Sequence, residues 1–342
     1  MGLEPTEQRE RLKTIIGRFS ERRIVVVGDA VADRFLYGEI SRVSREAPVL
    51  ILRHERTETV PGGAANCAIN LASLGAQVAL VGVVGEDEAG AALLDRLQAG
   101  GVPAGNVVQS SAVETTTKVR ILAGQLHSTR QQVIRVDYEG RPLSDEGLRK
   151  ELRARLLTEA ARADAVIISD YNYGVADAEM IAAVREATRE RAIPVLVDSR
   201  FRLSEFTGFT SATPNEDEVE QLLGMQHTGA DGLEAAGVEL RARLGHRALL
   251  ITRGAHGMLL LEEGSPPLHI EAVGALEAVD GTGAGDTVIA AYTLALASGA
   301  TFSDAAQLAN HAGGLVVMKR GTASIDRDEL LSSILRPSRL DG

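Results

Sequence analysis

A glycine-rich turn that opens directly into an apolar helical pattern constrains this chain most. Residues 280–287 read Asp-Gly-Thr-Gly-Ala-Gly-Asp-Thr, and residues 288–297 after them are almost all apolar or small. Glycines at alternate positions permit a tight turn that side chains would resist. The first N–H groups of the following helix lack intrahelical partners and form the positive end of its dipole, so they can hold an anion. With the carboxylate of Asp286 beside it, such a cradle suits phosphoryl transfer to a hydroxyl group.

Apolar runs alternate with helical patterns along most of the chain. The runs lie at 24–27, 78–81, 165–168, 194–197 and 248–251. They are continuous, which is typical of strands covered on both faces. The helical patterns lie at 64–74, 89–99, 145–161, 178–189, 216–223 and 232–244. This alternation predicts an α/β fold of three layers, with helices on both faces of a mostly parallel sheet and a ligand beyond the carboxyl ends of its strands.

Two segments interrupt this rhythm. Residues 35–60 and 115–138 alternate apolar and polar side chains. Alternation indicates strands with one face in solvent. We therefore expect one domain over residues 1–342, with a small β-sheet inserted in the α/β body as a lid.

Composition limits the partners. The formal net charge is −11, aromatic residues make up 3% and there is no Trp, which argues against a nucleic-acid or anionic-membrane surface. Cys67 is the single cysteine, so intramolecular disulfides are excluded, as is usual in a reducing cytoplasm. No apolar run reaches the roughly 18 residues that span a bilayer. We expect a cytoplasmic protein that binds neither nucleic acid nor membranes.

Two blocks resemble a known family, the PfkB or ribokinase-like carbohydrate kinases. One is Pro-Gly-Gly-Ala-Ala-Asn at 61–66, followed by Asn-Leu-Ala-Ser-Leu-Gly at 70–75, and the other is the turn at 280–287. They stand in the expected order, and the resemblance covers nearly the whole chain. It implies a ribokinase-like fold and an enzyme that uses ATP and Mg²⁺ to phosphorylate a sugar.

Within that family, four stretches resemble the D-glycero-β-D-manno-heptose 7-phosphate kinases: 28–35, 41–49, 117–120 and 169–171. The implied reaction is phosphorylation of a heptose 7-phosphate at its anomeric hydroxyl. The chain departs from the usual pattern at 198–200, where Asp-Ser-Arg stands in place of Asp-Pro-Lys. The departures leave open a kinase for ribose, a fructose phosphate or another sugar, and a non-catalytic sensor of sugar or nucleotide.

The glycine-rich turn carries the predicted chemistry. Asp286 would accept the proton of the attacking hydroxyl. The amides of Gly283, Ala284 and Gly285 would stabilise charge on the transferred phosphoryl group. An ordinary glycine-rich helix cap is the alternative. As in many relatives, the carbonyls of Asp280 and Thr282 could hold a monovalent cation such as K⁺, which the sequence does not decide.

The sugar side is predicted from small and polar residues. Gly62 and Gly63 would let the substrate approach the backbone, and the amide of Asn66 suits a sugar hydroxyl, although plain helix capping is the alternative. The resemblance implies that Asp33 bridges two hydroxyls, against the alternative of a solvated loop charge. Asp170 is a further predicted substrate residue.

Cations on the lid are candidates for the phosphate of the sugar. Arg34, Lys118 and Arg120 lie there, and we favour Lys118 and Arg120 because they occupy alternate positions on one strand face. A solvated lid face is the alternative.

The nucleotide side is assigned mainly by resemblance. The positions of Asn215 and Glu218 match an Asn-x-x-Glu pattern that organises Mg²⁺, often through water; an ordinary acidic first turn is the alternative. Thr252, Arg253 and Gly254 match the ATP phosphate contacts. Asn310 lies in a helical segment where relatives bind adenine.

The exposed strands of the lid also predict an oligomer. Unpaired strand edges invite association with another chain. We expect a homodimer formed through the lid.

Overall fold

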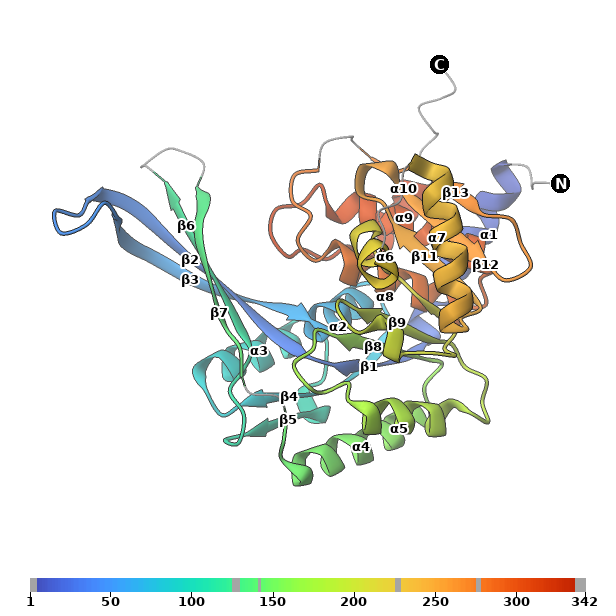
Figure 1. Cartoon of the computed structure of the whole chain (residues 1–342), viewed down its shortest axis with the longest axis horizontal. Coiled ribbons are helices and arrows are strands. Elements are labelled where there is room, and N and C mark those ends of the chain that lie inside the picture. The colour runs from blue at the N-terminus through green and yellow to red at the C-terminus, as the bar shows by residue number, and fades with distance from the viewer. Residues whose placement is uncertain (1–4, 125–129, 141–142, 225–228, 275–277, 336–342) are drawn as a thin grey trace, which may run out of the picture.

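The computed structural model describes residues 5–124, 130–140, 143–224, 229–274 and 278–335 (Figure 1). Within these ranges a nine-stranded sheet forms the centre of the molecule, in the order β13-β12-β11-β10-β9-β8-β1-β4-β5. Its strands are β1 (Arg23–Gly28), β4 (Gln77–Gly85), β5 (Val107–Ser110), β8 (Ala165–Asp170), β9 (Val195–Ser199), β10 (Ser211–Ala212), β11 (Ala248–Thr252), β12 (Met258–Glu262) and β13 (Leu268–Ile270). The strands from β5 to β11 are parallel, and β12 and β13 add antiparallel pairs at one edge.

Helices cover both faces of this sheet. Ile24 and Val26 of β1 belong to one apolar core, and Val25 and Val27 belong to the other, because successive side chains of a strand point to opposite faces. The first core is closed by α1 (Pro5–Gly17), α2 (Ala64–Ser73), α3 (Glu88–Ala99), α8 (Ala284–Ala297), α9 (Phe302–Val316) and α10 (Arg327–Leu335). The second is closed by α4 (Glu146–Ala160), α5 (Ala178–Thr188), α6 (Glu216–Leu223) and α7 (Gly229–Leu244). The predicted three-layer α/β architecture is confirmed.

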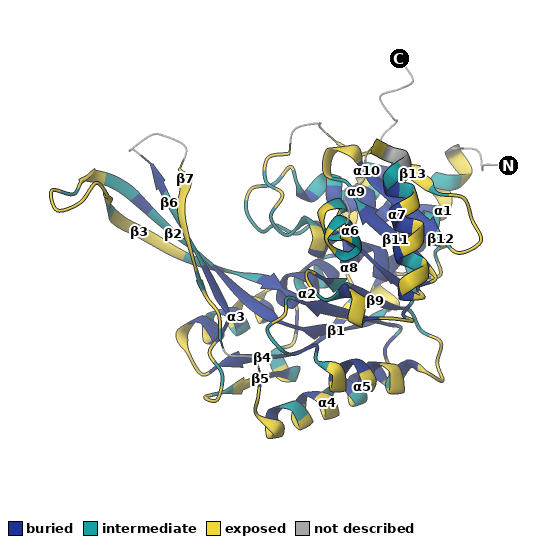
Figure 2. Ribbon diagram, viewed as in Figure 1, coloured by how far each residue is buried: buried dark blue, intermediate teal, exposed yellow. Residues whose placement is uncertain are grey.

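A second sheet of four strands extends from the body as an arm (Figure 1). It consists of β2 (Ala30–Val43), β3 (Leu50–Gly63), β6 (Thr117–Gly124) and β7 (Gln131–Tyr138), in the order β3-β2-β6-β7. The β2/β3 and β6/β7 pairs are antiparallel, and β2/β6 is parallel. Figure 2 shows that β2 and β3 are buried near the body and more exposed toward the tip of the arm, whereas most of β7 is exposed.

The arm starts earlier than the alternation predicts. Only Asp29 separates β1 from β2, and residues 30–33 are buried, so no polar alternation marks the start of the strand. Gly28 permits this junction because a Cβ there would stand 1.9 Å from the carbonyl oxygen of Ser169 on the neighbouring strand β8. In the described part of the chain, no helix combines the length and apolarity needed to cross a bilayer.

Candidate active site

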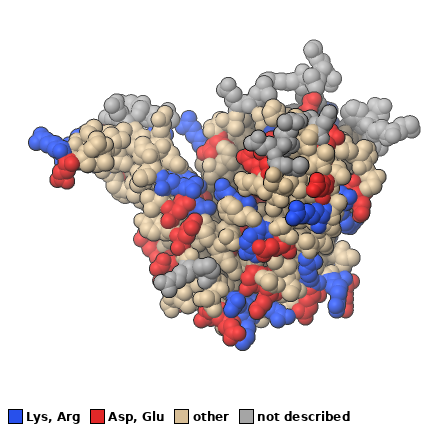
Figure 3. Space-filling view, viewed as in Figure 1, with Lys and Arg blue, Asp and Glu red and all other residues tan. Residues whose placement is uncertain are grey.

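A cavity of about 530 Å³ lies where the arm joins the body. It is lined by Val31, Asp33, Gly62, Gly63, Asn66, Lys118, Arg120, Tyr171, Arg200, Gly281, Thr282, Gly283, Gly285, Asp286 and Thr322. These residues come from the arm, from the first turns of α2 and α8, and from loops after β8 and β9. Figure 3 shows the hollow between arm and body, with charged side chains gathered at the junction.

The glycine-rich turn forms one wall of this cavity. Gly283 is the N-cap of α8 and has a φ of +77°, in the left-handed region that glycine adopts without a steric penalty. A Cβ at this position would lie 2.6 Å from Nδ2 of Asn66, so the turn also needs glycine for close packing. The start of α8 therefore faces the cavity, with the positive end of its dipole toward Asp286 and the space beside it.

Asp286 lies in the first turn of α8 and is 4% exposed. Nδ2 of Asn66 donates to its Oδ2 at 2.7 Å, and the hydroxyl of Tyr171 donates to its Oδ1 at 3.1 Å. Burial raises the pKa of Asp286 to about 7, although these two hydrogen bonds oppose the rise. A carboxylate with a pKa near neutrality can accept a proton at physiological pH.

Asn66 is held by a chain of buried amides. Nδ2 of Asn70 donates to Oδ1 of Asn66 at 3.2 Å, and Oγ1 of Thr287 donates to Oδ1 of Asn70 at 2.9 Å. Asn66 is predicted to bind a sugar hydroxyl, but both ends of its amide are engaged within the protein. The structure thus gives Asn66 a contact with Asp286 that the sequence did not indicate.

The arm contributes one paired and one unpaired cation. Arg120 forms an ion pair with Asp33, and both side chains line the cavity. Lys118 is 9% exposed, and its Nζ lies 5.4 Å from the ring centroid of Tyr171. Desolvation lowers the pKa of Lys118. Arg34 instead pairs with Glu88 at 2.9 Å and does not line this cavity.

Asp170, like Arg34, is a predicted substrate residue that does not line this cavity. Its Oδ2 accepts from Oγ of Ser199 at 2.7 Å, and it is 1% exposed. Arg202 lies 3.6 Å from the same carboxylate. These contacts give Asp170 a role in joining β8 to β9, so its predicted contact with substrate is not supported by its position.

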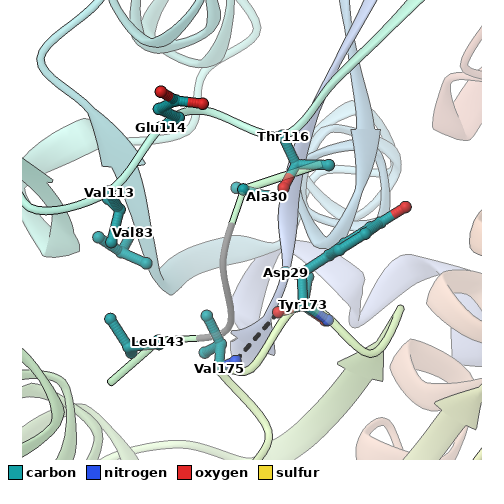
Figure 4. A pocket seen from close by; sticks show the side chains of 10 residues that line it. Asp29, Ala30, Val83, Val113, Glu114, Thr116, Leu143, Tyr173 and Val175 are labelled. Atoms are coloured by element: carbon teal, nitrogen blue, oxygen red, sulfur yellow. Dashed lines mark hydrogen bonds between the residues drawn. The ribbon is translucent and has the colours of Figure 1, made fainter. Parts of the chain in front are cut away.

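Asp29 fixes the loop that carries Tyr171. Its carboxylate accepts from the backbone N–H groups of Tyr171 at 2.9 Å, Tyr173 at 3.0 Å and Val175 at 3.1 Å. Figure 4 shows Asp29 with Tyr173 and Val175 around a small pocket next to β1. Burial raises the pKa of Asp29, while the three hydrogen bonds oppose the rise. The loop is therefore anchored to the end of β1.

A second cavity, of about 300 Å³, adjoins the first. Gly281 and Gly285 line both of them. Its other lining residues are mostly small or apolar: Thr252, Gly254, Ala255, Gly257, Met258, Ala272, Val273, Ala278, Ala284, Val288, Asn310, Gly313, Gly314 and Val317. Of the predicted nucleotide residues, Thr252, Gly254 and Asn310 are therefore brought together here. Arg253 lines a neighbouring cavity and pairs with Glu216 at 2.8 Å.

Asn215 and Glu218 form a capping box at the start of α6. Oδ1 of Asn215 accepts from the N–H of Glu218 at 2.8 Å, and Oε2 of Glu218 accepts from the N–H of Asn215 at 3.0 Å. Within the described ranges, no three His, Cys, Asp or Glu side chains cluster as a ready metal site. Desolvation and the neighbouring charges of Asp286 and Glu218 raise the pKa of Asp198 well above its usual value. A cation near these carboxylates would relieve that repulsion, so the residues fit Mg²⁺.

The side chain of Asp280 stabilises the turn. Its Oδ1 accepts from the N–H of Thr282 and its Oδ2 from the N–H of Gly321, both at 2.9 Å. Desolvation acts against this carboxylate, but the hydrogen bonds outweigh it and lower its pKa.

Five residues that line the first cavity have no role predicted from the sequence: Val31, Tyr171, Arg200, Gly281 and Thr322. Tyr171 lies in the stretch 169–171, and Arg200 belongs to a departure from a common pattern. Thr322 follows α9 in a segment without a recognisable motif. The resemblance of 169–171 to the heptose kinases was a signal that could have drawn attention to Tyr171.

Comparison with known proteins places this arrangement in a family. The model of the pfkB family of carbohydrate kinases matches residues 21–329. The chain belongs to that family. It is thus a phosphotransferase that acts on a sugar hydroxyl, as the glycine-rich turn and Asp286 suggested.

The relatives of this kinase include bifunctional proteins. The chain is 40% identical to the bifunctional protein HldE of Caulobacter vibrioides over 91% of its own length and 63% of the relative's. It is 41% identical to HldE of Pseudomonas aeruginosa, over 95% of its own length and 66% of the relative's. The kinase therefore spans about two thirds of the length of these relatives.

Solved structures show the same fold. Ribokinase of Arabidopsis thaliana, complexed with ribose and ATP, superposes with a TM-score of 0.72 at 23% identity, covering 92% of this kinase and 99% of that chain. Phosphofructokinase-2 of Escherichia coli, in complex with substrates and products, gives a TM-score of 0.75 at 20% identity, covering 92% and 98%. The ribokinase-like fold is confirmed.

Proposed function

We propose that this kinase transfers the γ-phosphoryl group of ATP to the anomeric O1 of D-glycero-D-manno-heptose 7-phosphate, giving heptose 1,7-bisphosphate. The resemblance of residues 28–35, 41–49, 117–120 and 169–171 to heptose 7-phosphate kinases supports this acceptor. The similarity to the HldE proteins agrees with a kinase of that group.

The observation that carries the proposal is the shared wall of the two cavities. Gly281 and Gly285 line both the small apolar cavity and the larger polar one. Adenine in the apolar cavity beside Asn310 would direct its phosphates past Thr252 and Gly254 toward the start of α8. The γ-phosphoryl group would then reach the amides of Gly283, Ala284 and Gly285, where an anion is favoured.

Asp286 would accept the proton of the sugar hydroxyl as that oxygen attacks phosphorus in line. Its buried position and its pKa of about 7 support this role. Closing the arm over the cavity would exclude water and so limit wasteful hydrolysis of ATP.

The sugar would lie against Asp33, Gly62 and Gly63. The charge of Arg120 is already matched by Asp33, whereas Lys118 lacks an ion pair within the described residues. We therefore propose Lys118 as the main cation that binds the phosphate of the sugar. Arg120 would bind the same phosphate once Asp33 hydrogen-bonds to the sugar hydroxyls.

Mg²⁺ would be held by Glu218 and Asn215, largely through water, with Asp198 nearby. Bound there, it would neutralise charge on the phosphates of ATP. The carbonyls of Asp280 and Thr282 are the proposed site for K⁺. Because the reaction draws on ATP and the one cysteine, Cys67, is a buried free thiol, we propose that the kinase works in the cytoplasm.

An acceptor screen tests this function. The purified kinase would be incubated with ATP and Mg²⁺ and with heptose 7-phosphate, heptose, ribose or fructose 6-phosphate, and ADP release would be followed. We expect release to be fastest with heptose 7-phosphate, and ³¹P NMR to show a new anomeric phosphate. Faster turnover with another sugar would overturn the acceptor assignment, and tight binding without ADP release would indicate a sensor.

A further inference from the structure

We propose that Tyr171 is a positioning residue for Asp286, acting together with Asn66. The two side chains hold one carboxylate oxygen each and so fix the direction in which Asp286 meets the sugar hydroxyl. This inference rests on the proposed role of Asp286 as the base.

The two hydrogen bonds to the carboxylate of Asp286 come from elements other than its own helix, α8. Asn66 lies in the first turn of α2 and donates to Oδ2 at 2.7 Å. Tyr171 follows β8 and donates to Oδ1 at 3.1 Å. A carboxylate held at both oxygens cannot rotate freely, although each oxygen keeps further acceptor capacity for a substrate.

The backbone of Tyr171 is itself fixed. Its N–H donates to Asp29 at 2.9 Å, at the end of β1. A Cβ on Gly63 would lie 3.3 Å from Cδ2 of Tyr171, so the chain of the arm passes close to the ring. Nζ of Lys118 lies 5.4 Å from the ring centroid on the cavity side. The hydroxyl therefore has a defined position.

The orientation of Asn66 follows from its neighbours. Its Oδ1 must accept, because Nδ2 of Asn70 donates to it, and Asn70 is in turn oriented by the backbone carbonyl of Asn66, which accepts from the same Nδ2 at 3.0 Å and cannot donate. Nδ2 of Asn66 is thus the atom that faces Asp286. The buried chain from Thr287 to Asn66 has only one consistent arrangement of donors.

Both acidic and basic side chains lie near Asp286. Asp33 on β2 and Asp198 on β9 are acidic residues, Lys118 on β6 is basic, and the thiol of Cys67 on α2 is buried close by. Burial and the neighbouring carboxylates raise the pKa of Tyr171 well above its usual value, so its hydroxyl remains a donor throughout the working range. Its hydrogen bond favours the charged form of Asp286, which burial disfavours.

Tyr171→Phe tests the role, with Tyr173→Phe as the matched control. Both rings lie near Lys118, at 5.4 and 5.7 Å, but the hydroxyl of Tyr173 donates to Glu139 rather than to Asp286. Tyr171→Phe should shift the acid limb of the kcat–pH profile upward by about one unit and lower kcat at pH 7 roughly five-fold, with KM for sugar and ATP within about two-fold. At pH 9 most of the activity should return. Tyr173→Phe should leave the profile in place.

A second variant and an NMR titration test the same role without relying on the kinetics of Tyr171→Phe alone. Asn66→Asp replaces the other donor with a carboxylate of the same shape, and it should shift the acid limb in the same direction by more. ¹³C NMR of labelled aspartate should show a higher pKa for Asp286 in Tyr171→Phe than in the wild type, without any substrate.

An unshifted profile in Tyr171→Phe, an equal loss of kcat at every pH, or an unchanged NMR titration would each overturn the inference. If the wild type releases no ADP with any sugar while the NMR shift is present, the proposed function fails and the contact between Tyr171 and Asp286 stands.

Discussion

Asp286, the proposed base, would favour catalysis at the expense of stability. Burial raises its pKa to about 7, so the folded protein holds a proton between about pH 4 and 7 that the unfolded chain releases. The contribution of this group to stability is therefore present at low pH and is lost as the pH rises to 7. Above pH 7 the folded protein carries a buried charge, which the hydrogen bonds from Asn66 and Tyr171 and the charge of Lys118 offset in part.

Asp286→Asn should consequently be inactive but more stable at alkaline pH. We expect kcat to fall roughly 10²–10⁴-fold, because the base is lost, with a smaller change in nucleotide binding. The melting temperature at pH 8 should rise above that of the wild type, and the difference should shrink at pH 5. Steady-state kinetics and calorimetry at both pH values measure these effects. Near-normal turnover would refute Asp286 as the base.

Two constraints favour glycine at position 283, a positive φ and close packing against Asn66, and two variants can separate them. Gly283→Ala introduces a side chain at a φ of +77° and places its Cβ 2.6 Å from Nδ2 of Asn66. Gly101 has a φ of +80° with open space around it, so Gly101→Ala carries the backbone penalty alone, about 1–2 kcal/mol. We expect Gly283→Ala to lose more stability than Gly101→Ala and to lose kcat as well. Equal melting temperatures in the two variants would show that Asn66 moves aside freely.

At the scale of elements, α6 combines a structural and a proposed catalytic task in one side chain. Glu218 closes the capping box with Asn215, and it is also the proposed Mg²⁺ residue. Glutamine can replace glutamate in such a box but has no charge. Glu218→Gln should keep the melting temperature within about 2 °C, since a lost cap is worth only about 1 kcal/mol, yet raise the Mg²⁺ concentration for half-maximal activity roughly ten-fold.

Asp217→Asn provides the control for Glu218→Gln. Asp217 is exposed in the same helical turn, so the substitution removes an equal charge without touching the box. Its Mg²⁺ dependence should match that of the wild type. If both variants respond alike, the effect is one of general charge, and Glu218 has no specific role.

The sequence predicted the elements whose pattern is local. The buried strands β1, β4, β8, β9 and β11 were found from continuous apolar runs. The strand β10 has two residues, and β12 and β13 form an antiparallel edge, so their existence depends on pairing with β11 rather than on their own pattern.

In the candidate site, too, the residues of a contiguous motif could be predicted, whereas the contacts between distant residues could not. The glycine-rich turn and Asp286 are contiguous and could be recognised. The contact of Asn66 with Asp286 joins positions 220 residues apart, and that of Tyr171 joins positions 115 apart. Hydrogen bonds of this range follow from the packing of α2, α8 and the loop after β8, which no local spacing encodes.

At the scale of the whole molecule, the arm has two faces: one lines the cavity with charged side chains, and the other, outer face carries apolar side chains. Lys118 and Arg120 face the cavity, and in the β6/β7 register they stand opposite Asp137 and Arg135. The alternate residues therefore point to the outer face of the arm, away from the cavity. There Val119 and Ile121 stand opposite Val136 and Ile134.

This outer face is the surface that we propose a second copy covers. Ile134 is 52% exposed and Tyr138 is 59% exposed, although both are large side chains with apolar surface. Neighbouring apolar side chains of this kind mark association surfaces. A stable dimer buries about 1,200–2,000 Å² in total, so the interface would extend beyond these few side chains along the arm.

Ile134→Lys tests the dimer, and Val133→Lys is its matched control. Val133 is the preceding residue on β7 and is 46% exposed, but the register shift leaves it without a paired residue on β6, outside the row of Ile134 and Val136. We expect the wild type and Val133→Lys to run as dimers in light scattering at micromolar concentration, and Ile134→Lys to run as a monomer because a charge in an apolar interface lacks a partner. If all three proteins have the mass of a monomer, the arm does not form a dimer. If only Val133→Lys dissociates, the interface lies at the register shift and does not include the row of Ile134 and Val136.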